Sequence, residues 1–180
     1  MRGAPNTYTD SMVQTTQPEQ LLALSELLFF AYRDFTGDAD EVLAEIGFGR
    51  AHHRVVHFVT RRPGLRVAEL LDILKITKQS LARVLRELID KDYIAQKRGE
   101  TDRRERLLYS TSAGEALAAR LALSQATRLS QAMIAAGPHG AESVAHFLSQ
   151  MVSGDENKHF SAFATLIRSA SGAGDETHRT

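Results

Sequence analysis

The chain has 180 residues, of which 43% are apolar and 24% charged, a composition typical of one globular domain with a core of its own. It contains no cysteine, which excludes disulfides, thiolate metal sites and redox sensing through a protein thiol. No apolar run approaches the ~20 residues that a membrane helix needs, and the first residues lack the apolar stretch of a secretory signal. We therefore expect a cytoplasmic protein without a membrane partner.

The net charge of zero conceals a strong segregation of charge along the chain. Residues 1–49 carry a net charge of −6, residues 50–106 carry +7, and residues 107–180 carry −1. A basic centre between acidic and nearly neutral flanks is expected where only the middle of the chain meets a polyanion.

The first third of the chain predicts an arm followed by helices. Residues 1–15 are polar and aperiodic, which is typical of a flexible arm. In the segment 16–64, apolar residues at helical spacing predict a first helix that ends near Gly37, because glycine suits a C-terminal cap. A short helical piece over 39–47 and a full helix over 48–62 follow.

Two short helices and a hairpin come next. Residues 66–74 and 77–92 each place their leucines and valines on one face, and only a tight turn separates them, which predicts a helix-turn-helix. Apolar and polar residues then alternate over 93–98 and, more loosely, over 106–111, which predicts two antiparallel strands. A helix-turn-helix followed directly by a hairpin is a winged helix, which we place at residues 65–111.

The last third of the chain predicts helices that need a partner. The segment 112–170 is helical in pattern, and residues 171–180 predict a disordered tail. The apolar spacing of 21–32 and 160–170 exceeds what one small lobe can cover, so these helices predict a homodimer. The predicted fold class is mainly α with a small β-hairpin wing: a winged helix-turn-helix lobe plus N- and C-terminal dimerisation helices.

The outer face of the helix over 77–92 suits the reading of DNA. At 100° per residue its apolar side chains share one side, and polar and basic side chains occupy the other. Arginine can donate two hydrogen bonds to guanine, glutamine can pair with adenine, and a helix N-terminus suits phosphate oxygens. The alternative is an ordinary solvated face. The candidate DNA-binding residues of this helix are Thr77, Lys78, Gln79, Ser80, Arg83 and Arg86.

The predicted wing supplies a second set of candidates in the stretch "KRGETDRRER". Arginine suits a narrow minor groove, where the negative potential is strongest. The acidic residue of the set would repel phosphate, so we expect it to hold an arginine by a salt bridge. The alternative is a solubilising hairpin tip. The candidate DNA-binding residues of the wing are Lys97, Arg98, Asp102, Arg103, Arg104 and Arg106.

The stretch "DRRERLLYSTSAG" resembles the wing of the MarR (multiple antibiotic resistance regulator) family. The family pattern is Asp-x-Arg, five residues, then Leu-Thr-x-x-Gly. Asp102 and Arg104 match its first half, and Thr111 and Gly114 match its second half. Ser110 stands where the family usually has leucine.

The stretch "ITKQSLARVLRELIDKDYI" is similar to the recognition helix of this family and to the turn into its wing, with Asp92 in place of the more usual glycine. The resemblance covers roughly residues 18–170 and is most specific over 67–114. It implies a homodimer built from the N- and C-terminal helices that binds a pseudo-palindromic operator. It also implies control by a small aromatic or anionic ligand bound between the dimer helices and the DNA-binding lobe, and hence a ligand-responsive repressor.

A ligand pocket would be walled by aromatic side chains of the first long helices, with an arginine for a carboxylate. The candidate ligand-binding residues are Phe29, Tyr32, Arg33, Arg54, His57 and Phe58.

The histidines leave a metal alternative open. In "AHHRVVH", His53 and His57 are four apart and share a helix face with His52 nearby, so a metal-responsive regulator is one possibility. Two ligands fall short of a closed zinc site, so a packed, hydrogen-bonded role is favoured, and we predict no metal and no cofactor. No catalytic motif is present, so we do not expect an enzyme. A winged helix that binds another protein is a further alternative, which the basic outer face disfavours.

Overall fold

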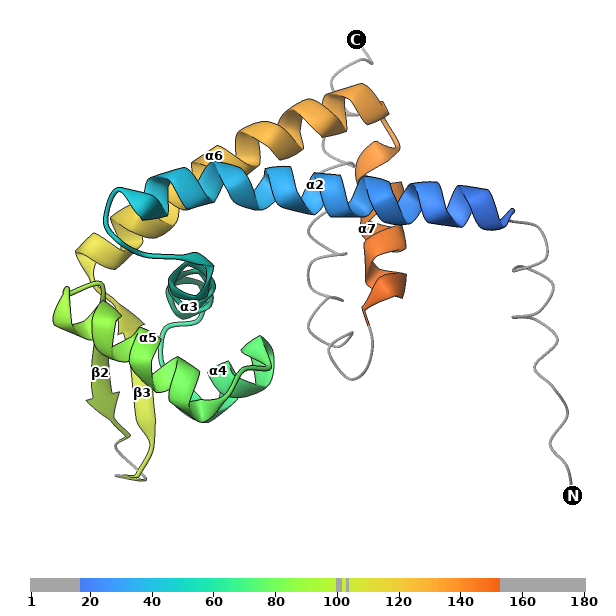
Figure 1. Cartoon of the computed structure of the whole chain (residues 1–180). Coiled ribbons are helices and arrows are strands. Elements are labelled where there is room, and N and C mark those ends of the chain that lie inside the picture. The colour runs from blue at the N-terminus through green and yellow to red at the C-terminus, as the bar shows by residue number, and fades with distance from the viewer. Residues whose placement is uncertain (1–16, 100–101, 103, 153–180) are drawn as a thin grey trace, which may run out of the picture. The chain divides into compact units, whose positions relative to one another are not determined.

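The computed structural model describes residues 17–99, 102 and 104–152 (Figure 1). The chain forms two compact units, Met1–Gln125 and Ala126–Thr180. Several predictions lie outside the described residues: the arm over 1–15, a last helix over 157–170, the tail over 171–180 and the wing residue Arg103.

The first helix, α2, runs without a break from Pro18 to Ala44. The predicted end near Gly37 is therefore wrong. A helix-interior glycine costs only about 1 kcal/mol relative to alanine, and the helix continues because Ala39 and Leu43, four residues apart on one face, are buried in the core. The chain turns only at Gly47, whose φ of 71° lies in the left-handed region that suits glycine.

The helix-turn-helix is present as predicted. Helix α3 (Arg50–Arg61) buries one face of valines and leads into α4 (Val67–Leu74) and α5 (Lys78–Asp90). The turn between α4 and α5 passes through Lys75, which adopts a left-handed φ of 51°. The side chain of Thr77 caps α5 by accepting a hydrogen bond of 3.1 Å from the backbone N–H of Ser80.

The predicted hairpin is confirmed, and a third, short strand joins it. Strands β2 (Ile94–Arg98) and β3 (Arg106–Ser110) pair antiparallel, and β1 (Leu65–Arg66) adds to the other edge of β3, which gives the order β1-β3-β2. The sequence did not predict β1, because a two-residue strand carries no alternation. Together with the helices, this small sheet confirms the predicted fold class.

One apolar core joins the helices and the sheet within the first unit. Fully buried side chains come from each of these elements except the short β1: Leu43, Val55, Leu70, Leu88 and Leu108 are each 0% exposed, and Ile94 of β2 is 1% exposed. Helix α6 (Ser112–Ala136) closes the core with Leu117 and Leu121. The core therefore fixes the orientation of α5 and the hairpin, which carry the candidate site.

The C-terminal described part consists of the end of α6 and of α7 (Gly140–Met151), which are separated at Gly137 with φ 78°. Within the described residues, no helix is long and apolar enough to cross a membrane.

Candidate nucleic-acid interface

Helix α5 turns one apolar face inward and one polar face outward. Leu81, Val84, Leu85 and Leu88 are buried in the core. The predicted DNA-facing side chains are all exposed on the other side: Thr77, Lys78, Gln79, Ser80, Arg83 and Arg86. The 3.6-residue period therefore separates structural from candidate functional residues along this helix as predicted.

The first turn of α5 is suited to an anion. Thr77 caps the helix, and its hydroxyl also donates to the hydroxyl of Ser80 over 2.9 Å. The first backbone N–H groups of a helix lack partners inside the helix, and the helix dipole places partial positive charge there. With Lys78 exposed beside it, this end can accept a phosphate group.

The guanidinium of Arg83 is available for an external partner. Within the part of the chain that the structure describes, Arg83 makes no ion pair or hydrogen bond through its side chain and lies exposed at the middle of the outer face. A guanidinium that is not committed elsewhere can donate both of its paired N–H groups to one guanine base.

The wing is shaped by the carboxylate of Asp102. Its Oδ1 accepts a hydrogen bond of 2.8 Å from the backbone N–H of Arg104, so Asp102 acts on the loop backbone in addition to any side-chain contact. The predicted salt bridge to an arginine side chain is not among the described interactions of Asp102. Exposed Lys97, Arg98 and Arg104 place positive charge along the hairpin, and the Nζ of Lys97 lies 4.9 Å from the ring centre of Tyr109.

The base of the wing is tied to the start of α4 by residues that the sequence analysis missed. The guanidinium of Arg66 on β1 contacts Glu69 at 2.9 Å and Glu105 at 3.1 Å. The hydrogen bonds from the side chain and then the backbone of Arg66 lower the pKa of Glu69 below its ordinary value. The spacing of Arg66 and Glu69, three residues across a helix start, was a signal for this contact.

A hollow of about 590 Å³ lies between α4, α5 and the sheet. Apolar side chains such as Val67, Leu71 and Leu85 line it, and Lys78, Arg86 and Arg106 contribute positive charge to its lining. Of the predicted DNA-binding residues, Lys78 and Arg86 of α5 and Arg106 of β3 line this hollow, whereas Arg83 and the other described wing residues do not.

Comparison with known proteins identifies the family. Residues 46–105 match the family model described as "MarR family". The chain is also 43% identical over 142 residues to the HTH-type transcriptional regulator PetP of Rhodobacter capsulatus, an alignment that covers 79% of this chain and 86% of that protein. The chain belongs to the MarR family. It is thus a DNA-binding transcriptional regulator with a winged helix, and the relatives that it matches are regulators rather than enzymes.

Solved structures of MarR-family proteins share the fold. The transcriptional regulator SlyA superimposes with a TM-score of 0.60 at 16% identity, covering 72% of this chain and 90% of SlyA. A mutant MarR from E. coli in complex with operator DNA gives 0.59 at 16% identity, covering 77% of this chain and all of the other. A MarR family protein from Mycobacterium tuberculosis in complex with p-aminosalicylic acid superimposes with a TM-score of 0.52 at 21% identity, covering 72% of this chain and 98% of that protein.

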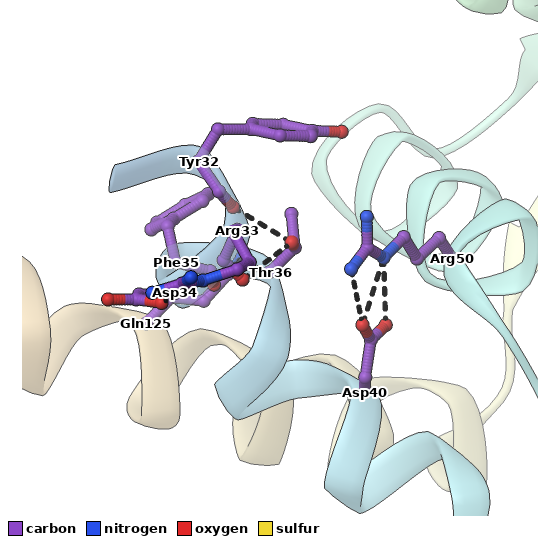
Figure 2. A network of polar contacts seen from close by, with 8 residues as sticks. All are labelled: Tyr32, Arg33, Asp34, Phe35, Thr36, Asp40, Arg50 and Gln125. Carbon is purple, nitrogen blue, oxygen red and sulfur yellow. Dashed lines mark hydrogen bonds and ion pairs between the residues drawn. The ribbon is translucent and has the colours of Figure 1, made fainter. Parts of the chain in front are cut away.

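The predicted ligand residues of this MarR-family chain are divided between two helices. On α2, Phe29 is 74% and Tyr32 is 58% exposed, and the guanidinium of Arg33 bonds Asp34 at 2.7 Å. Figure 2 shows Tyr32 projecting from α2 toward α3, where Arg50 holds Asp40 through its Nε and Nη2. The hollow described above is lined by none of the predicted ligand residues.

On α3, the predicted ligand residues point in different directions. The Nη2 of Arg54 donates a hydrogen bond of 2.9 Å to the backbone oxygen of Leu74, at the end of α4. His57 lies exposed with its ring centre 5.2 Å from that of Phe58, which packs against the core. Arg54 thus contacts the helix-turn-helix, whereas Tyr32 and Arg33 lie on α2.

His53 and His57 lie one turn apart on α3. The ring centres of His53 and His57 are 6.4 Å apart, and the described residues contain no group of three or more His, Asp or Glu that could hold an ion. Burial lowers the pKa of His53, against the opposing effect of Asp40. Although the residue His57 is exposed as a whole, its ring is partly shielded from water, and this desolvation, followed by the charges of Arg61, His53 and Arg62, lowers the pKa of His57.

Proposed function

We propose that this MarR-family protein is a repressor that binds a pseudo-palindromic operator as a homodimer and releases it when a small aromatic or anionic ligand binds. The observation that carries the DNA-binding part is the exposed outer face of α5, where Arg83 has no partner within the described residues. Arg106, at the start of strand β3, shares a hollow with Lys78 and Arg86 of α5. The related MarR of E. coli, which has the same fold, was solved with operator DNA.

The homodimer is supported by apolar surface that the single chain leaves uncovered. On α2, Leu22 is 66%, Leu27 64% and Phe29 74% exposed. In the second unit, Ile134 is 79% and Phe147 50% exposed. Monomeric proteins rarely expose apolar residues so densely, which favours burial against a second copy. We propose that residues 16–64 and 112–170 contain the dimerisation helices around the DNA-binding lobe at 65–111.

The oligomeric state can be measured directly. Sedimentation equilibrium at micromolar concentration should give twice the chain mass of 19.9 kDa. Leu27→Glu should weaken the dimer, because it places a charge on the proposed contact surface. Glu26→Gln, one residue earlier on the same helix, is the matched control and should leave the dimer intact. A stable monomer of the unchanged protein would refute the proposed architecture.

Alanine variants of the α5 and wing residues should lose DNA affinity in different ways, which separates base reading from phosphate contact. An operator recovered from random duplexes serves as the probe. Arg83→Ala should cost about 1–3 kcal/mol in affinity and relax the preference at one base pair, because Arg83 is proposed to read a base. Arg104→Ala should weaken all sequences more evenly and flatten the salt dependence, because a wing arginine acts through groove potential and phosphate. Equal, sequence-independent losses would show that α5 does not read bases.

The ligand response is proposed from the aromatic and basic residues that α2 presents. Tyr32 and Arg33 are exposed and could receive the ring and the carboxylate of an aromatic acid. The MarR-family structure from M. tuberculosis contains p-aminosalicylic acid. A ligand weakens DNA binding only if it binds the DNA-free form better, in which the two lobes are wrongly spaced for half-sites about 34 Å apart.

Salicylate is a suitable probe for this part of the proposal. It should raise the melting temperature and weaken operator binding, and Arg33→Ala should reduce both effects while leaving ligand-free DNA binding intact. Arg128→Ala, a basic residue of the second unit, is a control. If micromolar zinc shifts the melting temperature, salicylate does not, and His53→Ala removes the shift, the protein is a metal sensor instead.

A further inference from the structure

His52 makes the most buried polar contact between α3 and the DNA-reading helix. Its residue is 9% exposed, although histidine is polar. The Nδ1 of its ring accepts a hydrogen bond of 3.2 Å from the backbone N–H of Gly49. Because that nitrogen accepts, the neutral ring carries its proton on Nε2. Nε2 therefore donates to the Oε2 of Glu87 on α5, over 2.8 Å.

The ring of His52 is held in this orientation from several sides. It stacks on Phe48 with a centroid distance of 4.4 Å and an interplanar angle of 8°. Phe48 is in turn contacted by two residues that follow α5: the Nζ of Lys91 lies 4.6 Å from its ring centre, and Tyr93 packs edge-on against it. The donor that Glu87 meets is thus rigid, and its position is set by α3 and the loop before it.

Glu87 has another natural partner on its own helix. It lies four residues after Arg83, which is the spacing at which side chains of opposite charge meet on a helix surface. The residues one turn from Arg83 are otherwise Gln79, Ser80 and Arg86, so Glu87 is the acid of α5 that can reach it. The side chain of Glu87 is 42% exposed, so it can rotate toward Arg83 without displacing packed side chains.

A second cation near Glu87 is already engaged. Lys91 lies four residues after Glu87, but its Nζ donates to the backbone oxygen of Ile46 over 2.8 Å and contacts Phe48. A Glu87 carboxylate released from His52 would therefore find Arg83 as the accessible partner. The Arg83 guanidinium would then be partly neutralised and turned along the helix instead of outward.

We propose that His52 is a positioning residue for DNA recognition: by holding the Glu87 carboxylate against α3, it keeps the Arg83 guanidinium free for the DNA. This inference rests on the proposed role of Arg83. In this role the buried His52 needs neither a metal nor a small ligand. It also means that the affinity of α5 for DNA depends on the placement of α3.

The test is a double-mutant cycle with the full-length protein and the operator selected from random duplexes. His52→Ala should weaken binding about two- to fivefold, a small factor because exposed pairs at this helical spacing are weak. Glu87→Ala should bind as well as the unchanged protein or better. The double variant should regain the affinity of Glu87→Ala, because the competing carboxylate is gone.

Two controls make the cycle specific. Asp90→Ala removes another exposed carboxylate of α5, one that lies seven residues from Arg83. The double variant His52→Ala/Asp90→Ala should therefore bind the operator as weakly as His52→Ala alone. In the Arg83→Ala background, His52→Ala should cause no further loss. Thermal melts check that each variant is folded, and Glu87→Ala alone decides the matter if His52→Ala does not fold.

The outcomes distinguish this inference from the proposal beneath it. If the His52–Glu87 bond merely stabilises the lobe, Glu87→Ala will be as weak as His52→Ala and the double variant will not recover, which overturns the inference. If Arg83→Ala binds the operator normally, the proposed role of Arg83 in DNA recognition is refuted, whatever the result for His52→Ala.

Discussion

Substitution of Arg54 tests whether this residue serves a ligand or the helix-turn-helix. Its Nη2 donates a 2.9 Å hydrogen bond to the backbone oxygen of Leu74, the last residue of α4. The last carbonyl groups of a helix have no partner inside it, and a cation there also complements the helix dipole. The next residue, Lys75, holds a left-handed φ of 51° at the turn into α5.

The size of the effect follows from these contacts. A hydrogen bond contributes about 0.5–1.5 kcal/mol net, and a cation at a helix C-terminus about 0.3–1 kcal/mol. Arg54 is exposed, so the two do not add in full, and we expect Arg54→Ala to lower the free energy of unfolding by about 1 kcal/mol. Because the turn before α5 loosens, operator affinity without any ligand should fall as well.

Urea denaturation and fluorescence anisotropy with the operator measure the two quantities. The urea midpoint should fall without a change in the slope m. Arg54→Lys keeps the charge and should lose less. Arg120→Ala, which removes an exposed ion pair to Glu45, is the matched control and should change stability by less than about 0.5 kcal/mol. If Arg54→Ala leaves both stability and ligand-free binding unchanged but abolishes the response to salicylate, Arg54 is a ligand residue and the reasoning from its contact is wrong.

Two further predictions concern stability. Gly114→Ala should destabilise the protein by about 1–3 kcal/mol or more in urea titrations, because the added Cβ would overlap the backbone oxygen of Tyr93. Gly37→Ala should instead stabilise it, because a Cβ there meets nothing within 4 Å. Equal effects at both sites would contradict this account. Since burial lowers the pKa of His53 and His57, the unfolded chain binds protons that the folded chain does not. The free energy of unfolding should therefore be level above the unfolded pKa of about 6.5 and fall as the pH drops through the folded-state values. His53→Gln/His57→Gln should flatten that fall, and an unchanged slope would contradict the assignment.

Much of the lobe was predictable because its determinants are local. The apolar period of α5 and the capping Thr77 define where that helix begins and which face it buries, so the exposure of Arg83 and Arg86 followed from the sequence. The alternation in β2 and β3 predicted the hairpin in the same way. The unusual Asp92 of the wing turn also fits, because it adopts a φ of 59° that aspartate tolerates better than most residues.

Local signals gave the wrong answer where packing outweighed them. Gly37 resembles a helix end, but the burial of Ala39 and Leu43 beyond it carries α2 onward. The cost of one glycine in a helix is smaller than the gain from burying a leucine, about 1 against about 2 kcal/mol. Periodicity reports which face of a helix is apolar, and it does not report what that face meets.

The sequence by itself determined the class of protein: the charge segregation, the helix-turn-helix period and the wing pattern lie within short stretches of chain. Only the tertiary structure decided which partner each polar side chain of α3 has. His52 reaches Glu87 across 35 residues and Arg54 reaches Leu74 across 20. The sequence favours a hydrogen-bonded role for the histidines but names no partner, and it predicts a ligand-binding role for Arg54. The physical reason is that a hydrogen bond needs its two atoms within about 3 Å, and only the packing of α3 against α4 and α5 sets that distance.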